Sequence, residues 1–121
     1  MMIKSFRDLE IYKESYDLMI LLHKEIIKLP SYEIHELASQ IRRASKSIPA
    51  NIAEGWAKRN HEKEFKKHLD IALGSVNEME VHIDTAKDLS YLKSEFCTQI
   101  TTRYQNLGGK IVNLKRNWKT Y

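Results

Sequence analysis

The sequence predicts an all-α protein, a single antiparallel four-helix bundle in up-down-up-down order, and three observations support this prediction. Apolar residues recur every three or four positions in four separate stretches, the spacing that stacks side chains on one face of a helix. Sustained alternation of apolar and polar residues, which is typical of β-strands, is missing from the sequence. The 121 residues, 42% of them hydrophobic and 30% charged, fit one folded domain over residues 1–121.

The four apolar series define the expected helices, and each covers a different quarter of the chain. Their members are Leu9, Tyr12, Tyr16, Met19, Leu22 and Ile26; Ile34, Leu37, Ile41, Ala44, Ile48 and Ile52; Phe65, Leu69, Ala72, Val76, Met79, Ile83 and Ala86; and Phe96, Ile100, Tyr104, Leu107, Ile111, Leu114 and Trp118. At 1.5 Å per residue, we expect helices of about 22–29 residues.

Breaks between the series predict where the helices begin and end. The first helix ends at Pro30, because the residue before a proline avoids the helical region, and Ser31 is expected to cap the second. Asn60 is expected to cap the third helix, and the fourth is expected to begin at Ser94. The short turns between the series make consecutive helices antiparallel.

Two features depart from an ideal helix pattern. Pro49 lies inside the second series, where it removes one backbone donor, but the apolar stripe continues in register past it. We therefore expect a kink in the second helix near Pro49 and no break. Gly108-Gly109 lies inside the fourth series and indicates close helix packing or a local bend.

The net charge of +4 is unevenly distributed. Residues 42–67 and 96–121 each carry a net charge of +5, and the second of these segments contains no Asp or Glu. Residues 1–41 carry −2 and residues 68–95 carry −4. This alternation suits contacts with an anion or between copies of the chain.

The sequence favours no catalytic residue, cofactor or metal site. Glutamate is missing three positions before every histidine, which excludes the Glu-x-x-His motif of di-iron bundles. Glu78 and His82 could share a metal, but this spacing is more typical of an ordinary ion pair. A phosphate-binding loop is excluded, because Tyr104 stands in place of its first glycine and Ile111 follows Gly109-Lys110.

The cysteine content and hydropathy indicate a cytoplasmic protein that does not span a membrane. The single cysteine, Cys97, cannot form an intramolecular disulfide and is expected to be a small, partly buried hydrophobe. The longest apolar run, residues 18–22, is far shorter than the roughly 20 residues needed to cross a bilayer.

A polar row runs beside the apolar stripe of the second helix, and the third helix offers a row to face it. The first row is Gln40, Arg43, Ser47, Asn51 and Glu54, and the second is Ser75, Glu78 and His82. One interpretation is a solvated face. The other is a buried polar seam, between helices or subunits, that fixes their register at some cost in stability.

The same stretch carries a long motif. Residues 40–55 read Gln-x-Arg-Arg-Ala-x-x-Ser-Ile-Pro-Ala-Asn-Ile-Ala-Glu-Gly, and residues 69–80 read Leu-Asp-Ile-Ala-Leu-Gly-Ser-Val-Asn-Glu-Met-Glu. With Phe6-Arg7-Asp8-Leu9 and Leu29-Pro30, these segments resemble the bacterial four-helix-bundle family of 23S rRNA intervening-sequence proteins. The motif residues, whose role is structural or at an interface, are Gln40, Arg42, Arg43, Ser47, Asn51, Glu54, Gly55, Gly74, Ser75 and Glu80.

The resemblance implies a barrel-like homopentamer with a basic surface. A related branch serves as the accessory protein of diversity-generating retroelements, where its partners are a reverse transcriptase and nucleic acid. The leading hypothesis is therefore a non-enzymatic protein that binds RNA or DNA through phosphate contacts. The alternative is a protein-binding adaptor or scaffold, such as an accessory subunit of a reverse transcriptase.

Ten cations are the candidate phosphate contacts. They are Lys58, Arg59, Lys63, Lys66 and Lys67 around the second turn, and Arg103, Lys110, Lys115, Arg116 and Lys119 in the fourth helix. Tyr104, Trp118 and Tyr121 could stack on bases, although the first two fall on the apolar stripe and are better explained as core residues.

The first helix carries more apolar residues than one stripe needs, which predicts self-association. Ile11 and Leu18 lie one heptad apart, as do Ile20 and Ile27. If both extra rows were exposed, they would form a patch of the kind that marks an interface. The competing interpretation is a broad core-facing stripe that absorbs them.

Overall fold

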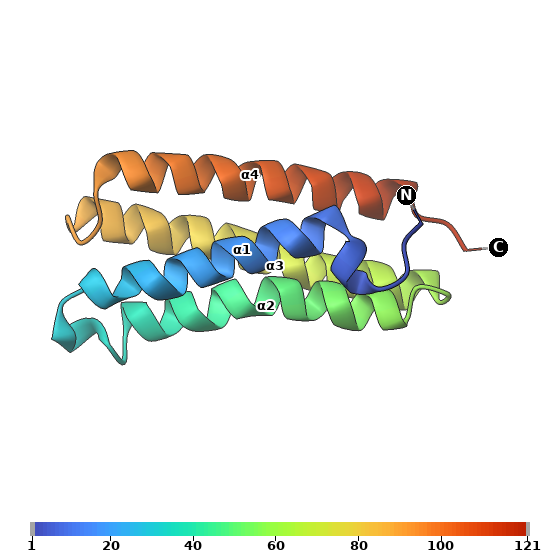
Figure 1. Ribbon diagram of the computed structural model, residues 1–121, viewed down its shortest axis with the longest axis horizontal. Coiled ribbons are helices and arrows are strands. Elements are labelled where there is room, and N and C mark those ends of the chain that lie inside the picture. Colours follow the sequence, from blue (N-terminus) through green and yellow to red (C-terminus); the bar gives the residue numbers. More distant parts are fainter. Residues whose placement is uncertain (1, 121) are drawn as a thin grey trace.

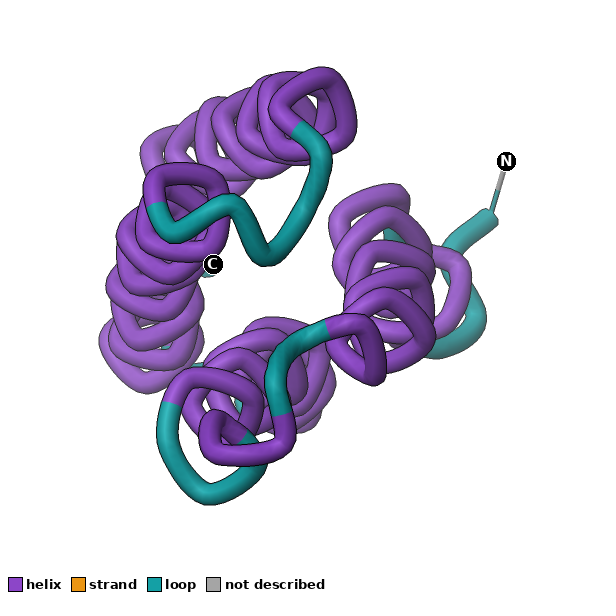
Figure 2. The backbone as a smooth tube through the Cα atoms, turned by 90° about the vertical axis from the view of Figure 1, so that its left-hand side faces the viewer, coloured by secondary structure: helices purple, strands orange, loops and turns teal. Residues whose placement is uncertain are grey.

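The computed structural model describes residues 2–120, in which four α-helices and three short 3₁₀ turns account for all regular structure; it is 82% helical. The helices are α1 (Glu10–Glu25), α2 (Leu37–Ala57), α3 (Glu62–Asp88) and α4 (Ser94–Asn117). Both α1 and α3 pack against α2 and α4, so α1 and α3 lie at opposite corners (Figures 1 and 2). The predicted all-α up-down-up-down bundle is confirmed.

The helix ends differ from the prediction at the first connection. Residues 26–36 form two 3₁₀ turns, Ile26–Lys28 and Ser31–Glu33, so α1 and α2 contain only 16 and 21 residues. Ser31 begins the second of these turns and does not cap α2, whose N-cap residue is Glu36. That expectation was wrong because Pro30 is followed by a separate turn before the apolar stripe can begin its helix.

The cap of α3 also lies one residue later than predicted. The N-cap residue is His61, not Asn60, and its side chain makes no capping hydrogen bond. Ser94 does begin α4 as predicted. A capping box that the sequence analysis missed precedes α1, where Ser5 and Asp8 close the turn Phe6–Asp8.

The buried face of α1 is rotated from the predicted stripe. Ile11, Ser15, Leu18 and Leu22 are buried, whereas Tyr16 is 43% exposed. The broad core-facing stripe therefore absorbs the row of Ile11 and Leu18, and the expectation that this row lies outside was wrong. Both rows have helical spacing, and the tyrosine hydroxyl favours a position at the edge of the core.

The two irregular positions fit into continuous helices. α2 runs through Pro49 without a break, as predicted, and the kink itself stays a prediction. A side chain at Gly108 would lie 3.5 Å from Val76 on α3, so this glycine supports the close-packing interpretation. Gly109 has open space around it.

Among the described residues three hydroxyl groups are buried in an otherwise apolar core, and those of Ser15 and Ser45 donate to backbone carbonyl oxygens of their own helices. Tyr104 is fully buried, and its Oη has no hydrogen-bond partner among the described residues. Burial raises the pKa of this hydroxyl above its ordinary value of 10.0, because the phenolate form cannot be solvated.

Removing this hydroxyl should stabilise the fold. A buried donor without a partner costs about 1–3 kcal/mol, so we expect Tyr104→Phe to raise the free energy of unfolding by about 1 kcal/mol or more. Urea denaturation followed by circular dichroism measures the change. Tyr16→Phe, at a partly exposed position, is the matched control and should leave stability unchanged. A less stable Tyr104→Phe variant would contradict this account of the core.

Candidate nucleic-acid interface

The two basic segments of the sequence meet at one end of the bundle. The turn between α2 and α3 lies beside the C-terminal end of α4, at the right of Figure 1. After α4 ends at Asn117, the chain continues in an extended conformation and is joined to this turn by two hydrogen bonds. Trp118 Nε1 donates to the carbonyl oxygen of Arg59 at 3.0 Å, and the Thr120 amide donates to Glu62 Oε1 at 3.1 Å.

An aromatic cluster holds this end together. Trp118 packs edge-to-face against Phe65 and Trp56, with ring centroids 4.8 and 5.8 Å apart. The guanidinium of Arg59 lies over the Trp56 ring, 4.7 Å from its centroid. These contacts make Trp118 part of the packing, as its place on the apolar stripe indicated. Tyr104 is in the core, and Tyr121 lies outside the described residues.

Eight of the ten predicted cations gather here, and we call this region the basic end. They are Lys58, Arg59, Lys63, Lys66, Lys67, Lys115, Arg116 and Lys119, accompanied by the carboxylates of Glu54, Glu62, Glu64 and Asp70. The basic end therefore has a net excess of four positive charges, which equals the net charge of the whole chain.

Some of these cations are used inside the protein. Lys66 pairs with Glu62 at 3.3 Å, and Lys115 on α4 pairs with Asp70 on α3 at 2.7 Å. Among the described residues, Lys58 and Arg59 make no ion pair but contact His68 and Trp56. The cations of the basic end that make neither an ion pair nor a side-chain hydrogen bond within the described part of the chain are Lys63, Lys67, Arg116 and Lys119. Lys63, Lys67 and Arg116 are exposed side chains on two different helices.

The remaining two predicted cations lie elsewhere and bind α1. Arg103 Nε donates to Glu14 Oε1 at 3.0 Å, and Lys110 Nζ donates to Glu10 Oε1 at 2.6 Å. Their spacing of seven residues places both on the flank of α4 that faces α1, whereas Lys115 falls on the flank that faces α3. These ion pairs connect α4 to both of its neighbours.

The polar rows of α2 and α3 form a half-buried seam within one chain. Ser75 Oγ donates to Ser47 Oγ at 2.9 Å, and Asn51 Nδ2 donates to the Ser47 carbonyl oxygen at 2.8 Å. His68, which the sequence analysis missed, completes the seam with its Nδ1 3.1 Å from Asn51 Oδ1. It lies seven residues, or two helical turns, before Ser75, so the predicted row only had to be extended by two turns towards the N-terminus.

The hydrogen bonds of the seam determine the tautomer of His68. The amide nitrogen of Asn51 is used by Ser47, so its Oδ1 faces His68 and accepts a hydrogen bond from Nδ1. The other ring nitrogen, Nε2, then accepts from the ammonium of Lys58 at 3.1 Å. A neutral His68 with its hydrogen on Nδ1 therefore satisfies both neighbours.

The other motif residues divide between structural roles and open surface. Gly55 allows α2 to approach α3, because a Cβ at this position would lie 2.8 Å from the Cβ of His68. Arg42 donates to the Ile34 carbonyl oxygen at 3.0 Å, and Glu80 accepts from Gln105 on α4 at 3.1 Å. Further motif residues make no hydrogen bond or ion pair between side chains in the described structure; these are Gln40, Arg43 and Gly74.

The residues weighed for metal binding and nucleophilic chemistry have ordinary structural partners. His82 Nε2 lies 3.0 Å from Glu78 Oε2, and within residues 2–120 no three His, Cys, Asp or Glu side chains gather as a metal site would require. Cys97 is buried, and burial raises the pKa of its thiol. Among the described helices, none is long and apolar enough to cross a bilayer.

The sequence matches the family of 23S rRNA-intervening sequence proteins over residues 7–113. The chain belongs to this family. A comparison with curated proteins found no match to the sequence. The family match covers the whole seam and most of α4, and it ends before the segment around Trp118 that closes the basic end. The motif segments singled out in the sequence, residues 40–55 and 69–80, lie on α2 and α3 and fall within this match.

The seam should contribute measurably to stability. Asn51→Ala leaves His68 Nδ1 and Ser47 without their partner, so we expect the free energy of unfolding to fall by about 1–3 kcal/mol. Asn106→Ala, on the exposed face of α4, makes the same chemical change without breaking such a network and serves as the control. Equal unfolding free energies for the two variants, measured in urea, would show that the seam is not stabilising.

The tie between the C-terminal segment and Glu62 should be sensitive to acid. The Thr120 amide and the Lys66 ammonium hold the pKa of Glu62 below its ordinary value of 4.5. A lowered carboxyl pKa stabilises the fold at higher pH, and this contribution is lost as pH falls through the folded pKa. We expect wild type to be more stable than Glu62→Gln at about pH 6 and this difference to shrink towards about pH 3.

The measurement is urea denaturation at each pH, with Glu64→Gln as the control. Glu64 occupies the same first turn of α3 and makes no ion pair within the described residues. A difference between wild type and Glu62→Gln that stays constant down to about pH 3 would contradict the role assigned to this carboxylate.

Proposed function

We propose that this protein is a non-enzymatic, oligomeric helical-bundle protein of the cytoplasm that associates with RNA or DNA through its basic end. The observation that carries the proposal is the convergence of two basic segments, distant in sequence, at one end of the bundle. Because the ion pairs of Arg103 and Lys110 are used to connect α4 with α1, we leave these two residues out of the proposed contact surface.

Binding of this kind depends on phosphates. Lys63, Lys67 and Arg116 extend from two helices into solvent, so that they can each neutralise a phosphate and release condensed counterions. Phosphate contacts position a nucleic acid without reading its bases. Trp56 and Trp118 pack against each other, which leaves their faces largely committed to the protein. The proposal is therefore binding with little sequence preference.

Assembly would strengthen such binding. One subunit offers a modest excess of positive charge, and an oligomer multiplies both the field and the number of phosphates contacted. The resemblance to the family implies a homopentamer, and we adopt that state as part of the proposal. The family description refers to 23S rRNA, so RNA is the first ligand to test.

Charge reversal at the basic end should weaken binding to RNA. We expect Lys63→Glu/Arg116→Glu to lower the affinity for a fluorescently labelled 20-nucleotide RNA of arbitrary sequence, measured by anisotropy. On a single strand each lost contact lowers the slope of log affinity against log salt by about 0.7, so losing two contacts lowers it by about 1.4. A second RNA of unrelated sequence should lose affinity to the same extent.

A control variant with the same change of net charge separates the effect of position from the effect of total charge. Lys87→Glu/Lys93→Glu reverses two exposed lysines at the opposite end of the bundle and should retain most of the affinity. Circular dichroism establishes that both variants fold. Equal weakening by the two variants, or an affinity that does not depend on salt, would overturn the proposal and favour the protein-adaptor hypothesis.

A further inference from the structure

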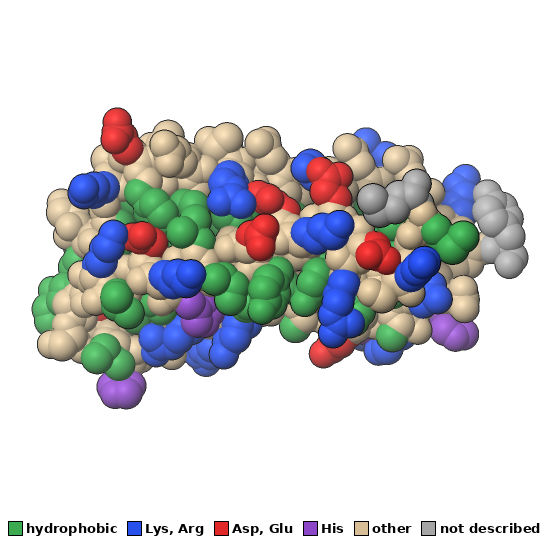
Figure 3. Space-filling model, in the orientation of Figure 1, with side chains coloured by type: hydrophobic (Ala, Val, Ile, Leu, Met, Phe, Trp, Pro, Cys, Tyr) green, Lys and Arg blue, Asp and Glu red, His purple; other side chains and the backbone are tan. Residues whose placement is uncertain are grey.

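The seam between α2 and α3 reaches the basic end at His68. This side chain is only 11% exposed, and it lies between Asn51 of α2 and Lys58, the residue that follows α2. Its Nε2 lies 3.1 Å from the ammonium of Lys58, and its Nδ1 lies 3.1 Å from Asn51 Oδ1. Figure 3 shows the Lys and Arg side chains at this end of the bundle, on the right. His68 therefore connects a half-buried network to a surface cation.

The charged side chains around His68 come from three elements. They are Lys58 and Glu54 on the side of α2, Glu64 and Lys67 on α3 itself, and, from α4, Lys115 in its ion pair with Asp70. Among the described residues, Lys58 and Glu54 are the two that approach the ring nitrogens, at 3.1 and 3.8 Å. The imidazole thus has a cation on one side and a carboxylate on the other.

Protonation of His68 reverses its relation to both neighbours. The neutral ring accepts a hydrogen bond from Lys58 through Nε2, whereas the protonated ring carries a hydrogen on Nε2 and has no acceptor left for the ammonium. Two positive charges at this separation repel each other, and Glu54 attracts the new charge.

The rest of the seam is the same in both states. Nδ1 donates to Asn51 whether the ring is neutral or protonated. The ring has little freedom to move away from Lys58, because the Cβ of His68 lies against α2 at Gly55. Protonation therefore displaces the flexible Lys58 side chain and leaves the contact between α2 and α3 intact.

We propose that His68 is a pH-sensitive switch that holds Lys58 at the seam when neutral and releases it to the phosphates of RNA when protonated. Histidine is the side chain whose charge ordinarily changes between roughly pH 5 and 8. This inference rests on the proposed function, because it describes the regulation of the basic end. Each released lysine adds one phosphate contact per subunit, so RNA binding strengthens as pH falls.

The salt dependence of RNA binding tests the switch. All proteins carry His61→Gln, because His61 is exposed at the start of α3 and its protonation would add a charge to the same end. With the fluorescent 20-nucleotide RNA described above, we expect the slope of log affinity against log salt to be steeper by about 0.7 at about pH 5.5 than at about pH 8.

Two substitutions should abolish this difference in slope. In His68→Gln the side-chain amide can donate to Asn51 and accept from Lys58 at every pH, so the lysine stays held. In Lys58→Gln the imidazole still titrates, but no lysine is released. Because Lys58 is exposed, this second variant tests the switch even if His68→Gln does not fold.

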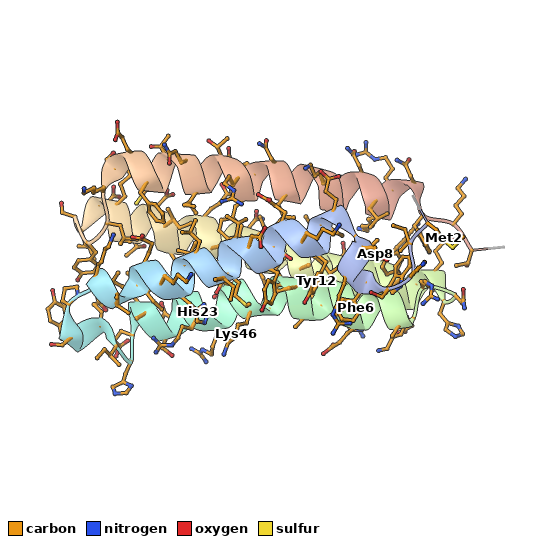
Figure 4. All side chains as sticks on the ribbon, viewed as in Figure 1. Met2, Phe6, Asp8, Tyr12, His23 and Lys46 are labelled. Carbon is orange, nitrogen blue, oxygen red and sulfur yellow. The ribbon has the colours of Figure 1, made fainter. Side chains whose placement is uncertain are left out.

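His23→Gln is the matched control. Figure 4 shows His23 in the half of the bundle away from the basic end, and its Nδ1 lies 2.9 Å from the Met19 carbonyl oxygen. This variant should retain the full difference in slope between the two pH values.

The outcomes separate the switch from the proposed function. A pH-dependent slope that survives in Lys58→Gln overturns the release of this lysine. RNA binding with the same slope at both pH values in the parent protein overturns the switch and leaves the proposed function in place. The absence of RNA binding at both pH values overturns both.

Discussion

The close approach of α2 to α3 is the constraint on which the rest of the structure depends. At Gly55 the two helices come so near that any larger residue would meet the side chain of His68. This approach brings Asn51 and Ser47 within hydrogen-bond distance of α3, and it keeps the following turn short. This short connection places the carbonyl oxygen of Arg59 within hydrogen-bond distance of Trp118, the residue that follows α4. The seam, the aromatic cluster and the basic end all follow from one contact between two backbones.

Helix α4 shows how a charge pattern in a sequence is redistributed by folding. Residues 96–121 contain five cations and no Asp or Glu, yet Arg103, Lys110 and Lys115 are each paired with an acid on a neighbouring helix. Exposed pairs of this kind contribute little stability each, but they fix which flank of α4 faces α1 and which faces α3. The unpaired positive charge is thereby displaced from the middle of the helix to its end.

The sequence predicted the fold class and most of the buried positions, because helical periodicity reports directly on which residues face a core. The prediction of buried positions was wrong on α1, where two rows of residues both have helical spacing. Tyr16 was counted as apolar, but its hydroxyl group favours a position at the edge of the core. The prediction of helix caps failed at Ser31 and Asn60, where local cap preferences were overruled by a 3₁₀ turn and by the length of the α2–α3 connection. The sequence showed which segments are rich in cations but not which cations form ion pairs. Those pairs depend on which residues of neighbouring helices come into contact. His68 was missed for the same reason.

The distribution of polar and apolar side chains in this bundle is partly inverted. A polar network, from Ser75 to Lys58, occupies a half-buried helix contact, while three aromatic rings and several aliphatic side chains lie at the surface between α1 and α2. A monomer gains no stability from this arrangement, since apolar surface in water is left uncovered. The polar seam fixes how α2 and α3 pack within one chain. Burial of this aromatic groove is the apolar contact that the proposed self-association would gain.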